Sequence, residues 1–159
     1  MIKNYTTSVT EEKTVGEIMG LLAAKGARSI QINYDDQARP MGVSFMLVLE
    51  SVPVPFKLPC NFDGVFRALA ANYKDRSAKV RFERNLANRL QARRVAWRIV
   101  KDWVAAQMAL VEAEQATMAQ VFLPYVSYRD GLTYYDKFMA ELVNPERQLA
   151  ARNEGPDLA

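Results

Sequence analysis

A long, regularly spaced stripe of mainly apolar residues in the second half of the chain constrains the fold more than any other feature. From Phe82 to Phe122 these residues recur in steps of three and four, close to the period of an α-helix, and no proline interrupts them before Pro124. One continuous helix of this extent would be about 60 Å long. Because that exceeds the width of a compact domain of 159 residues, we expect the helix to project, bend or pack against a second copy.

Two tryptophans, Trp97 and Trp103, lie within this predicted helix. Six residues correspond to about 240° around a helix axis, so the two indoles lie on different faces. Between about residues 95 and 111 the helix is apolar on more than half of its circumference and needs two packing partners. We expect one partner to be the sheet layer and the other to be the C-terminal helix or a symmetry mate. Both tryptophans are interpreted as core anchors, with base stacking as the alternative.

The first part of the chain alternates strand and helix signals. Closely spaced β-branched and aromatic residues predict a first strand at 1–9. Thr14 and Glu17 have the spacing of a capping box, which predicts a helix of about three turns that ends before Gly26. This strand and this helix are the first two elements of a small predicted α+β layer.

The next stretch predicts a hairpin and a further strand. Residues 28–34 and 41–50 are rich in β-branched and apolar residues and flank a polar turn, and residues 51–59 continue extended. Pro53 and Pro55 stand two apart and cannot donate to a ladder, so one side of this strand lacks donors. They predict an edge strand, in which prolines prevent edge-to-edge pairing. A peptide-docking groove is the alternative interpretation.

A short helix at 61–73, with Asn61 or Asp63 as its cap, closes this layer. Its apolar residues are expected to face the sheet; they are Phe62, Val65, Phe66 and Leu69. The order strand, helix, three strands, helix predicts an α+β fold with a small antiparallel sheet at residues 1–73. A helical extension at 74–145, made of the long basic amphipathic helix and a short C-terminal helix, packs on this layer. Residues 146–159 are expected to fray.

The composition argues against several classes of function. The chain has no histidine and one cysteine, Cys60, so the commonest general base and the commonest zinc ligand are missing. The seven glycines form no phosphate-binding loop. We therefore expect a non-enzymatic protein without cofactor or metal, with Cys60 as a small buried apolar residue. The single cysteine, the short apolar runs and the lack of a signal pattern predict a cytoplasmic protein with no membrane contact.

Positive charge is concentrated between Lys74 and Lys101. This segment has ten cationic and two acidic residues, a net charge of +8, whereas the whole chain carries +3 and the remainder therefore −5. Solvated faces usually mix the two signs, and the planar guanidinium of arginine suits phosphates and stacked bases. We predict contacts to a nucleic-acid backbone, DNA or RNA, with low sequence specificity. The predicted contact residues are Arg81, Arg84, Arg89, Arg94, Arg98 and Lys101.

Two other interpretations of the basic row stay open. The row could be a solvated face that only keeps the protein soluble. Alternatively, Arg94 and Arg98 could pair with acidic residues of a second copy in an antiparallel dimer. The acidic candidates are Glu112, Glu114 and Glu141.

Two tyrosines near the C-terminus are candidates for a second contact. Tyr125 and Tyr128 lie in a turn that begins with proline, beside Arg129. Exposed tyrosines in such a turn could stack on bases or form part of a surface for a protein partner.

Three stretches carry a resemblance to known sequences: "IKNYTTSVTEEKTVGEI", "RVAWRIVKDWVAAQMALVEAE" and "VFLPY". They resemble a group of small uncharacterised proteins of bacteriophages and related mobile elements. The resemblance implies that setting, and implies no activity, fold or functional residue. The expected function is a nucleic-acid-binding accessory protein. The alternative is a protein-binding inhibitor of a host defence or ribonucleoprotein complex, or an assembly factor. A homo-oligomer is expected in either case.

Overall fold

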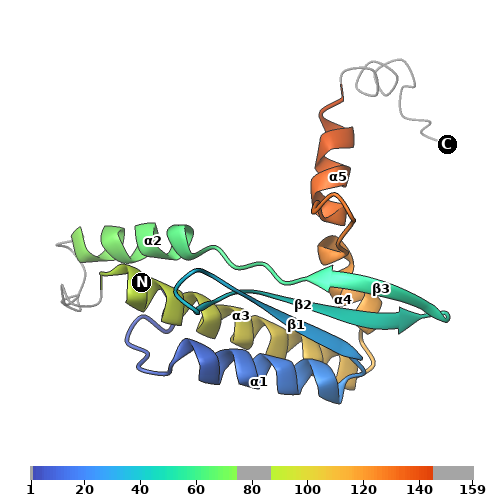
Figure 1. Ribbon diagram of the computed structural model, residues 1–159, viewed down its shortest axis with the longest axis horizontal. Coiled ribbons are helices and arrows are strands. Elements are labelled where there is room, and N and C mark those ends of the chain that lie inside the picture. Colours follow the sequence, from blue (N-terminus) through green and yellow to red (C-terminus); the bar gives the residue numbers. More distant parts are fainter. Residues whose placement is uncertain (1, 75–86, 145–159) are drawn as a thin grey trace.

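A three-stranded antiparallel sheet lies against a layer of helices in the computed structural model of the protein (Figure 1). The structure describes residues 2–74 and 87–144. The expected α+β class, with a small antiparallel sheet and a long helix, is confirmed. The elements in chain order are α1 (Glu11–Ala24), β1 (Ser29–Tyr34), β2 (Pro40–Leu49), β3 (Val52–Lys57), α2 (Phe62–Lys74), α3 (Arg89–Glu112), α4 (Met118–Phe122), the 3₁₀ turn η2 (Leu123–Tyr125) and α5 (Tyr134–Leu142).

The sheet has the order β1-β2-β3, with β2 at its centre. Alternate residues of β2, namely Val43, Phe45 and Leu47, are buried against the helices, as the period of a strand requires. The prediction that β3 is an edge strand is confirmed. Pro53 and Pro55 lie opposite Val48 and Met46 of β2.

The helix α1 begins one turn earlier than the spacing of Thr14 and Glu17 predicts. The N-cap is Thr10, whose side chain accepts a hydrogen bond from the Lys13 backbone N–H. Thr14 is instead buried inside the helix, and its hydroxyl donates to the Thr10 carbonyl at 3.1 Å. The predicted end is confirmed, since Gly26 follows the helix with φ of +99°.

The strand expected at residues 1–9 is wrong. The described part of this segment forms a turn at residues 3–6, in which Asn4 has φ of 63°. The segment is held by side chains of α3 rather than by a neighbouring strand. The Gln91 amide donates to the carbonyls of Tyr5 and Thr7, and Asp102 accepts from the Asn4 amide.

The long helix is shorter than expected. It spans 24 residues, which corresponds to about 36 Å, and it ends at Glu112 rather than continuing to Phe122. The chain turns at Glu114, which has φ of 55°, and Thr117 then caps α4 in a capping box with Gln120. The expected helical stretch at 82–86 lies outside the described residues. The length that suggested a projecting helix or a second copy is therefore absent.

Both tryptophans of α3 pack within the chain. Trp97 is fully buried, meets Phe62 edge to face, and donates from Nε1 to the Pro40 carbonyl at 3.2 Å. Trp103, on the other face, meets Phe122 and Tyr125 edge to face. Their expected role as packing residues is confirmed. The second partner is α4 with η2, and not the C-terminal helix.

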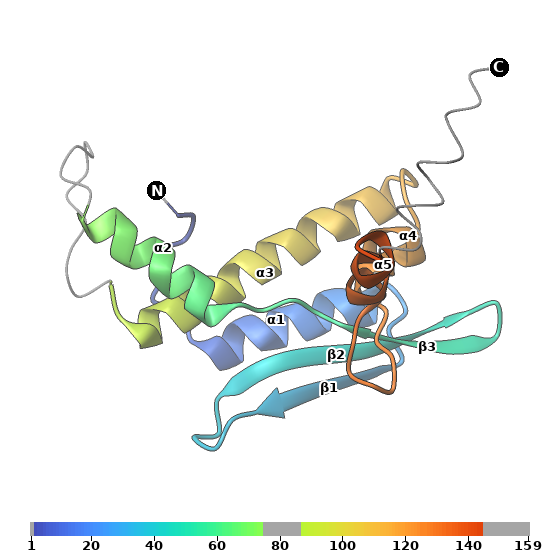
Figure 2. The ribbon, with the colours of Figure 1, turned by 90° about the horizontal axis from the view of Figure 1, so that it is seen from above.

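The helix α2 packs on α3 rather than on the sheet, contrary to expectation (Figure 2). Leu69 is fully buried in a small cluster with Ala92 of α3, and Tyr5 of the N-terminal segment packs against the same cluster. Asn61 caps the helix as predicted, because its side chain accepts from the Gly64 N–H at 2.8 Å. The N-terminal segment, which was expected to form a strand, instead packs its apolar side chains against the buried face of α2.

Candidate nucleic-acid interface

Four of the six predicted phosphate-binding residues can be placed, and all four lie on α3. Arg81 and Arg84 lie outside the described residues. Arg94, Arg98 and Lys101 follow one another at spacings of four and three, so they share one face of the helix. Arg89 lies apart from them, beside the start of α2, where it forms an ion pair of 2.8 Å with Asp63.

An open groove of about 560 Å³ runs between α1 and α3 beside this face. The two helices run in the same direction, as Figure 1 shows. Arg98 and Lys101 line the groove from α3. The remaining lining residues are mostly small or apolar; they are Glu17, Gly20, Leu21, Ala24 and Ala105. A polyanion lying in the groove would therefore meet cations along one wall.

Carboxylates of the same chain offset part of this positive charge. Arg98 Nη1 lies 2.6 Å from Glu17 Oε2, and the Arg98 side chain is only 18% exposed. Lys101 Nζ lies 3.7 Å from Asp102 Oδ1. The ion pair of Arg98 thus forms with Glu17 of the same chain rather than with the acidic residues proposed for a dimer.

Asp102 is itself held by several groups. The Asn4 amide donates to it at 3.0 Å and the Lys3 ammonium lies 3.1 Å away. The hydrogen bond from Asn4, followed by that from Lys3, lowers the pKa of the Asp102 carboxyl below its usual range. Asp102 therefore carries its negative charge at neutral pH and fastens the N-terminal segment to α3.

Arg94 is the predicted contact residue whose charge is least offset. It is half-buried, and no ion pair joins it to another described residue. Lys13 of α1 is exposed and equally without an ion pair in the described part of the chain. Substitution of Arg94 is therefore the most direct test of phosphate contact on this face.

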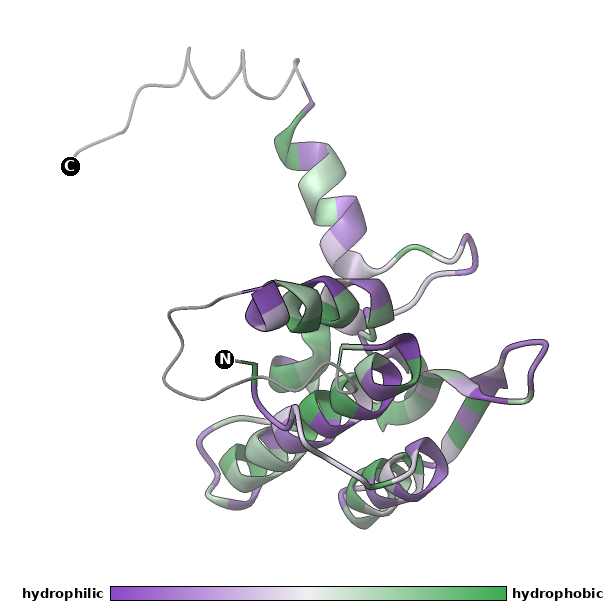
Figure 3. Cartoon of the chain, turned by 90° about the vertical axis from the view of Figure 1, so that its left-hand side faces the viewer, coloured by the Kyte–Doolittle hydropathy of each residue, from purple (hydrophilic) through white to green (hydrophobic). Residues whose placement is uncertain are grey.

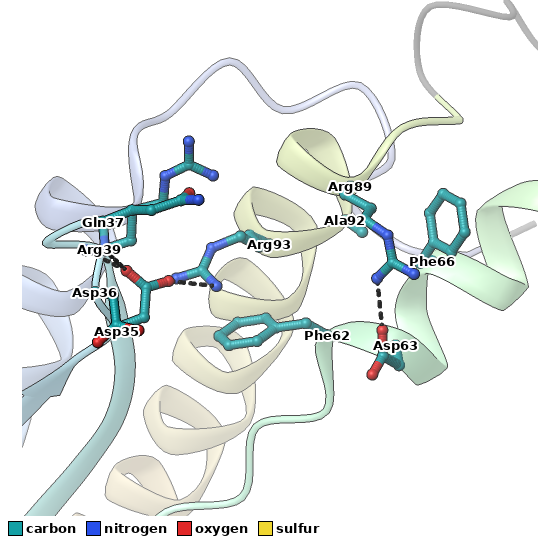
Figure 4. Close-up of a pocket in the computed structure, with 10 residues that line it drawn as sticks. All are labelled: Asp35, Asp36, Gln37, Arg39, Phe62, Asp63, Phe66, Arg89, Ala92 and Arg93. Carbon is teal, nitrogen blue, oxygen red and sulfur yellow. Dashed lines mark hydrogen bonds and ion pairs between the residues drawn. The ribbon is translucent and has the colours of Figure 1, made fainter.

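A second concavity, which sequence reasoning missed, lies at the N-terminal end of α3. This cleft of about 410 Å³ is bounded by the β1–β2 turn, the start of α2 and α3 (Figure 4). Its central residue is Arg93. Arg93 donates from Nε to both oxygens of Glu11 at 3.1 and 2.9 Å and from Nη2 to the Pro40 carbonyl at 2.8 Å. Its guanidinium also lies over the Phe62 ring, 4.4 Å from the centroid, and 3.3 Å from Asp35.

The charges of this cleft are matched internally. Burial raises the pKa of the Glu11 carboxyl, and the Arg93 guanidinium opposes that effect. The backbone N–H of Arg39 bonds to Asp35 and lowers the pKa of its carboxyl. A phosphate entering the cleft would have to displace a carboxylate from Arg93. We therefore interpret the cleft as a structural junction, and no pattern of spacing in the sequence could have revealed it.

The two candidate stacking residues lie away from the basic face. Tyr125 packs on Trp103, with ring centroids 5.3 Å apart. Because Trp103 and Lys101 are two residues apart, about 200° around the helix, they point to opposite sides of α3. Tyr128 is 40% exposed, and the Lys137 ammonium lies 4.6 Å from its ring centroid. The structure therefore does not join these tyrosines to the predicted phosphate row.

Cys60 packs against the edge of the main core. Burial raises the pKa of its thiol to about 12, so the thiol stays protonated at neutral pH. A protonated thiol is a weak nucleophile. Within residues 2–74 and 87–144, no three His, Cys, Asp or Glu side chains gather as metal ligands.

The short helix α5 stands away from the rest of the molecule (Figure 3). Its base is fixed, since the Tyr134 N–H bonds to the Val126 carbonyl and Thr133 forms a capping box with Asp136. Several of its apolar side chains are 38–55% exposed; they are Tyr134, Tyr135, Phe138 and Met139. Helices with an uncovered apolar face commonly bind other proteins.

Comparison of the chain with protein families, with curated proteins and with solved structures found no match. Among the helices that the structure describes, none has the length and apolar character needed to cross a bilayer.

Proposed function

We propose that this chain is a non-enzymatic nucleic-acid-binding protein with low sequence specificity. We place it in the cytoplasm as an accessory protein of a phage or mobile element. The observation that carries this proposal is the segregation of charge. Residues 74–101 have a net charge of +8 in a chain of +3, and Arg94, Arg98 and Lys101 share one face of α3 beside an open groove.

The geometry of this face suits a phosphate backbone. Seven residues separate Arg94 from Lys101, a rise of about 10 Å along the helix. One strand of a duplex has a phosphate about every 3.4 Å, so the face spans about three phosphates. The small residues of the groove, such as Gly20, Ala24 and Ala105, offer no side-chain donors for reading base edges. Contact through phosphates alone gives affinity without sequence specificity.

The internal ion pairs set the expected strength of binding. Glu17 competes with an incoming phosphate for the Arg98 guanidinium, so the groove should bind phosphates more weakly than three unpaired cations would. We therefore expect modest affinity that falls steeply with salt concentration.

The test is fluorescence anisotropy with labelled single- and double-stranded oligonucleotides of several sequences over a series of salt concentrations. Arg94→Gln should weaken binding to every sequence and lower the slope of log affinity against log salt by about 0.7 to 0.9. Arg129→Gln removes the same charge from an exposed site in the segment between α4 and α5. If the two variants lose affinity equally, or if the wild type binds no oligonucleotide at low salt, the proposal is wrong.

The second candidate is a protein-binding inhibitor of a host defence or ribonucleoprotein complex, or an assembly factor. The uncovered apolar residues of α5 favour it. This candidate takes first place if oligonucleotides do not bind. Under the nucleic-acid proposal, a Tyr135→Ser variant of α5 should bind oligonucleotides as the wild type does.

A further inference from the structure

The two edges of the sheet are protected to very different degrees. On the β3 side, Pro53 and Pro55 present no N–H groups, and the Pro55 carbonyl already accepts from the Ser127 N–H at 2.8 Å. On the other side, β1 has the sequence SIQINY, with neither a proline nor a charged residue. Prolines, charges and covering segments are the usual protection of an edge strand against pairing. The β1 edge has none of these within the strand.

The register shows which backbone groups of β1 are free. The Leu58 N–H donates to the Val43 carbonyl, so odd-numbered residues of β2 direct their backbone groups to β3 and even-numbered ones to β1. Gln31 lies opposite Ser44 and therefore bonds toward β2. Its neighbours Ile30 and Ile32 direct their N–H and C=O groups away from the sheet. Figure 2 shows β1 at the outer rim, with no described element beyond it.

The charges at the two ends of β1 indicate which partner strand could pair with this edge. Exposed Arg28 precedes the strand, and Asp35 and Asp36 follow it. Neither Arg28 nor Asp36 forms an ion pair with another described residue. If two copies of β1 pair antiparallel with Ile32 opposite Ile32, then Arg28, which precedes the strand in each copy, comes to the end where the β1–β2 turn with Asp36 lies in the other. A parallel arrangement would instead bring like charges together.

We propose that β1 pairs antiparallel with β1 of a second copy, so that two three-stranded sheets join into one sheet of six strands. The free backbone groups of Ile30 and Ile32 form the central hydrogen bonds of this interface, and the Arg28–Asp36 pairs at its two ends set direction and register. The contact is isologous, because each copy contributes the same strand. This inference does not depend on nucleic-acid binding.

The test uses the full chain in sedimentation equilibrium over a range of concentrations. The wild type should form a dimer of twice 18.0 kDa. Arg28→Glu should weaken the dimer about ten-fold, because it brings like charges together at both ends of the paired strands. Asp36→Arg should have the same effect. The double variant Arg28→Glu/Asp36→Arg exchanges the two signs and should restore dimerisation to within about three-fold of the wild type.

Lys13→Glu is the matched control, since it reverses an exposed charge on α1 and should leave the dimer unchanged. Amide hydrogen exchange provides a second readout: the N–H groups of Ile30 and Ile32 should become protected as concentration rises. A chain that stays monomeric overturns the proposal. So does a dimer that is indifferent to Arg28→Glu, one that the double variant fails to restore, or one in which these two amides exchange freely.

Discussion

Arg93 Nε lies 2.9 Å from Glu11 Oε2, and the two side chains are only 13% and 5% exposed. This ion pair joins the first turn of α1 to the N-terminal part of α3 across 82 residues of sequence. The Pro40 carbonyl accepts from both Arg93 and Trp97, so the start of β2 is fixed at the same point. One arginine thereby fixes how two helices and the sheet meet.

Replacing Arg93 with methionine should therefore destabilise the protein strongly. The variant keeps much of the side-chain volume but leaves the Glu11 carboxylate buried without its counter-ion, which typically costs about 3 to 5 kcal/mol. Urea denaturation measures this loss. Arg129→Met, at an exposed position, should change stability by less than about 0.5 kcal/mol. An Arg93→Met variant as stable as that control would show that the ion pair does not hold the fold together.

The acid side of the stability profile should depend on Asp102. Its pKa is lowered in the folded state, so its contribution is present above the ordinary value of 3.8 and is lost as pH falls through the folded pKa. Asp102→Asn should thus lower stability at pH 7, and the difference from the wild type should disappear in strong acid. Urea denaturation at pH 7 and at about pH 2.5 measures this difference. A constant difference across this range would contradict the assigned contacts with Asn4 and Lys3.

The Cys60 thiol should react slowly with disulfide reagents in the folded protein. A rise of its pKa from 9.0 to about 12 lowers the thiolate fraction at pH 8 by a factor of about 1000. The rate of labelling by an aromatic disulfide should therefore increase sharply when urea is added. Equal rates in the native and unfolded chain would show that the thiol is accessible in the folded protein.

Trp97→Ala and Trp103→Ala should each lower the melting temperature. Both indoles pack against aromatic rings, and truncation of such a residue costs about 3 to 5 kcal/mol when it is fully buried. The loss should be greater for Trp97, which is fully buried and hydrogen-bonded to the Pro40 carbonyl. A variant that melts like the wild type and yet loses oligonucleotide affinity would favour base stacking instead.

The sequence predicts those elements whose signals are local. The β-branched and apolar runs at 28–34 and 41–50 and the pair Pro53 and Pro55 sufficed to predict the hairpin and the edge strand, because strand propensity and missing donors act within a few residues. The N-terminal segment could not be predicted in the same way. Its backbone is held by Gln91 and its Asn4 side chain by Asp102, both far along the chain. These long-range hydrogen bonds determine the conformation of the segment and override its local β-propensity.

The end of α3 and the pairing of its arginines show the same limit. The apolar stripe continues past Glu112 because α3 and α4 both face the core, so periodicity alone hides the turn at Glu114. The spacing of Thr117 and Gln120, which form a capping box in the structure, is the one local signal that could have marked a new helix. Likewise, the sequence alone does not show that Arg98 is paired, because Glu17 comes close to it only in the folded chain.

Glu17→Gln offers the most direct test of the groove between α1 and α3. The change removes a negative charge and releases Arg98 from its ion pair of 2.6 Å. If phosphates bind along this face, the variant should bind oligonucleotides more tightly than the wild type. Its slope of log affinity against log salt should rise by up to about 0.7 to 0.9, because one more cation becomes available. Stability should fall by no more than about 1 kcal/mol, since the pair is partly exposed.

Glu12→Gln is the matched control for this gain. It removes an equal charge from an exposed position on α1 that has no ion pair with another described residue. Simple long-range repulsion predicts similar small gains from both variants, and these should vanish at high salt. Release of Arg98 predicts a larger gain from Glu17→Gln, and that gain should be lost when Arg98→Gln is added. If Glu17→Gln binds no more tightly than the wild type, Arg98 is a structural residue and the groove is not the nucleic-acid surface.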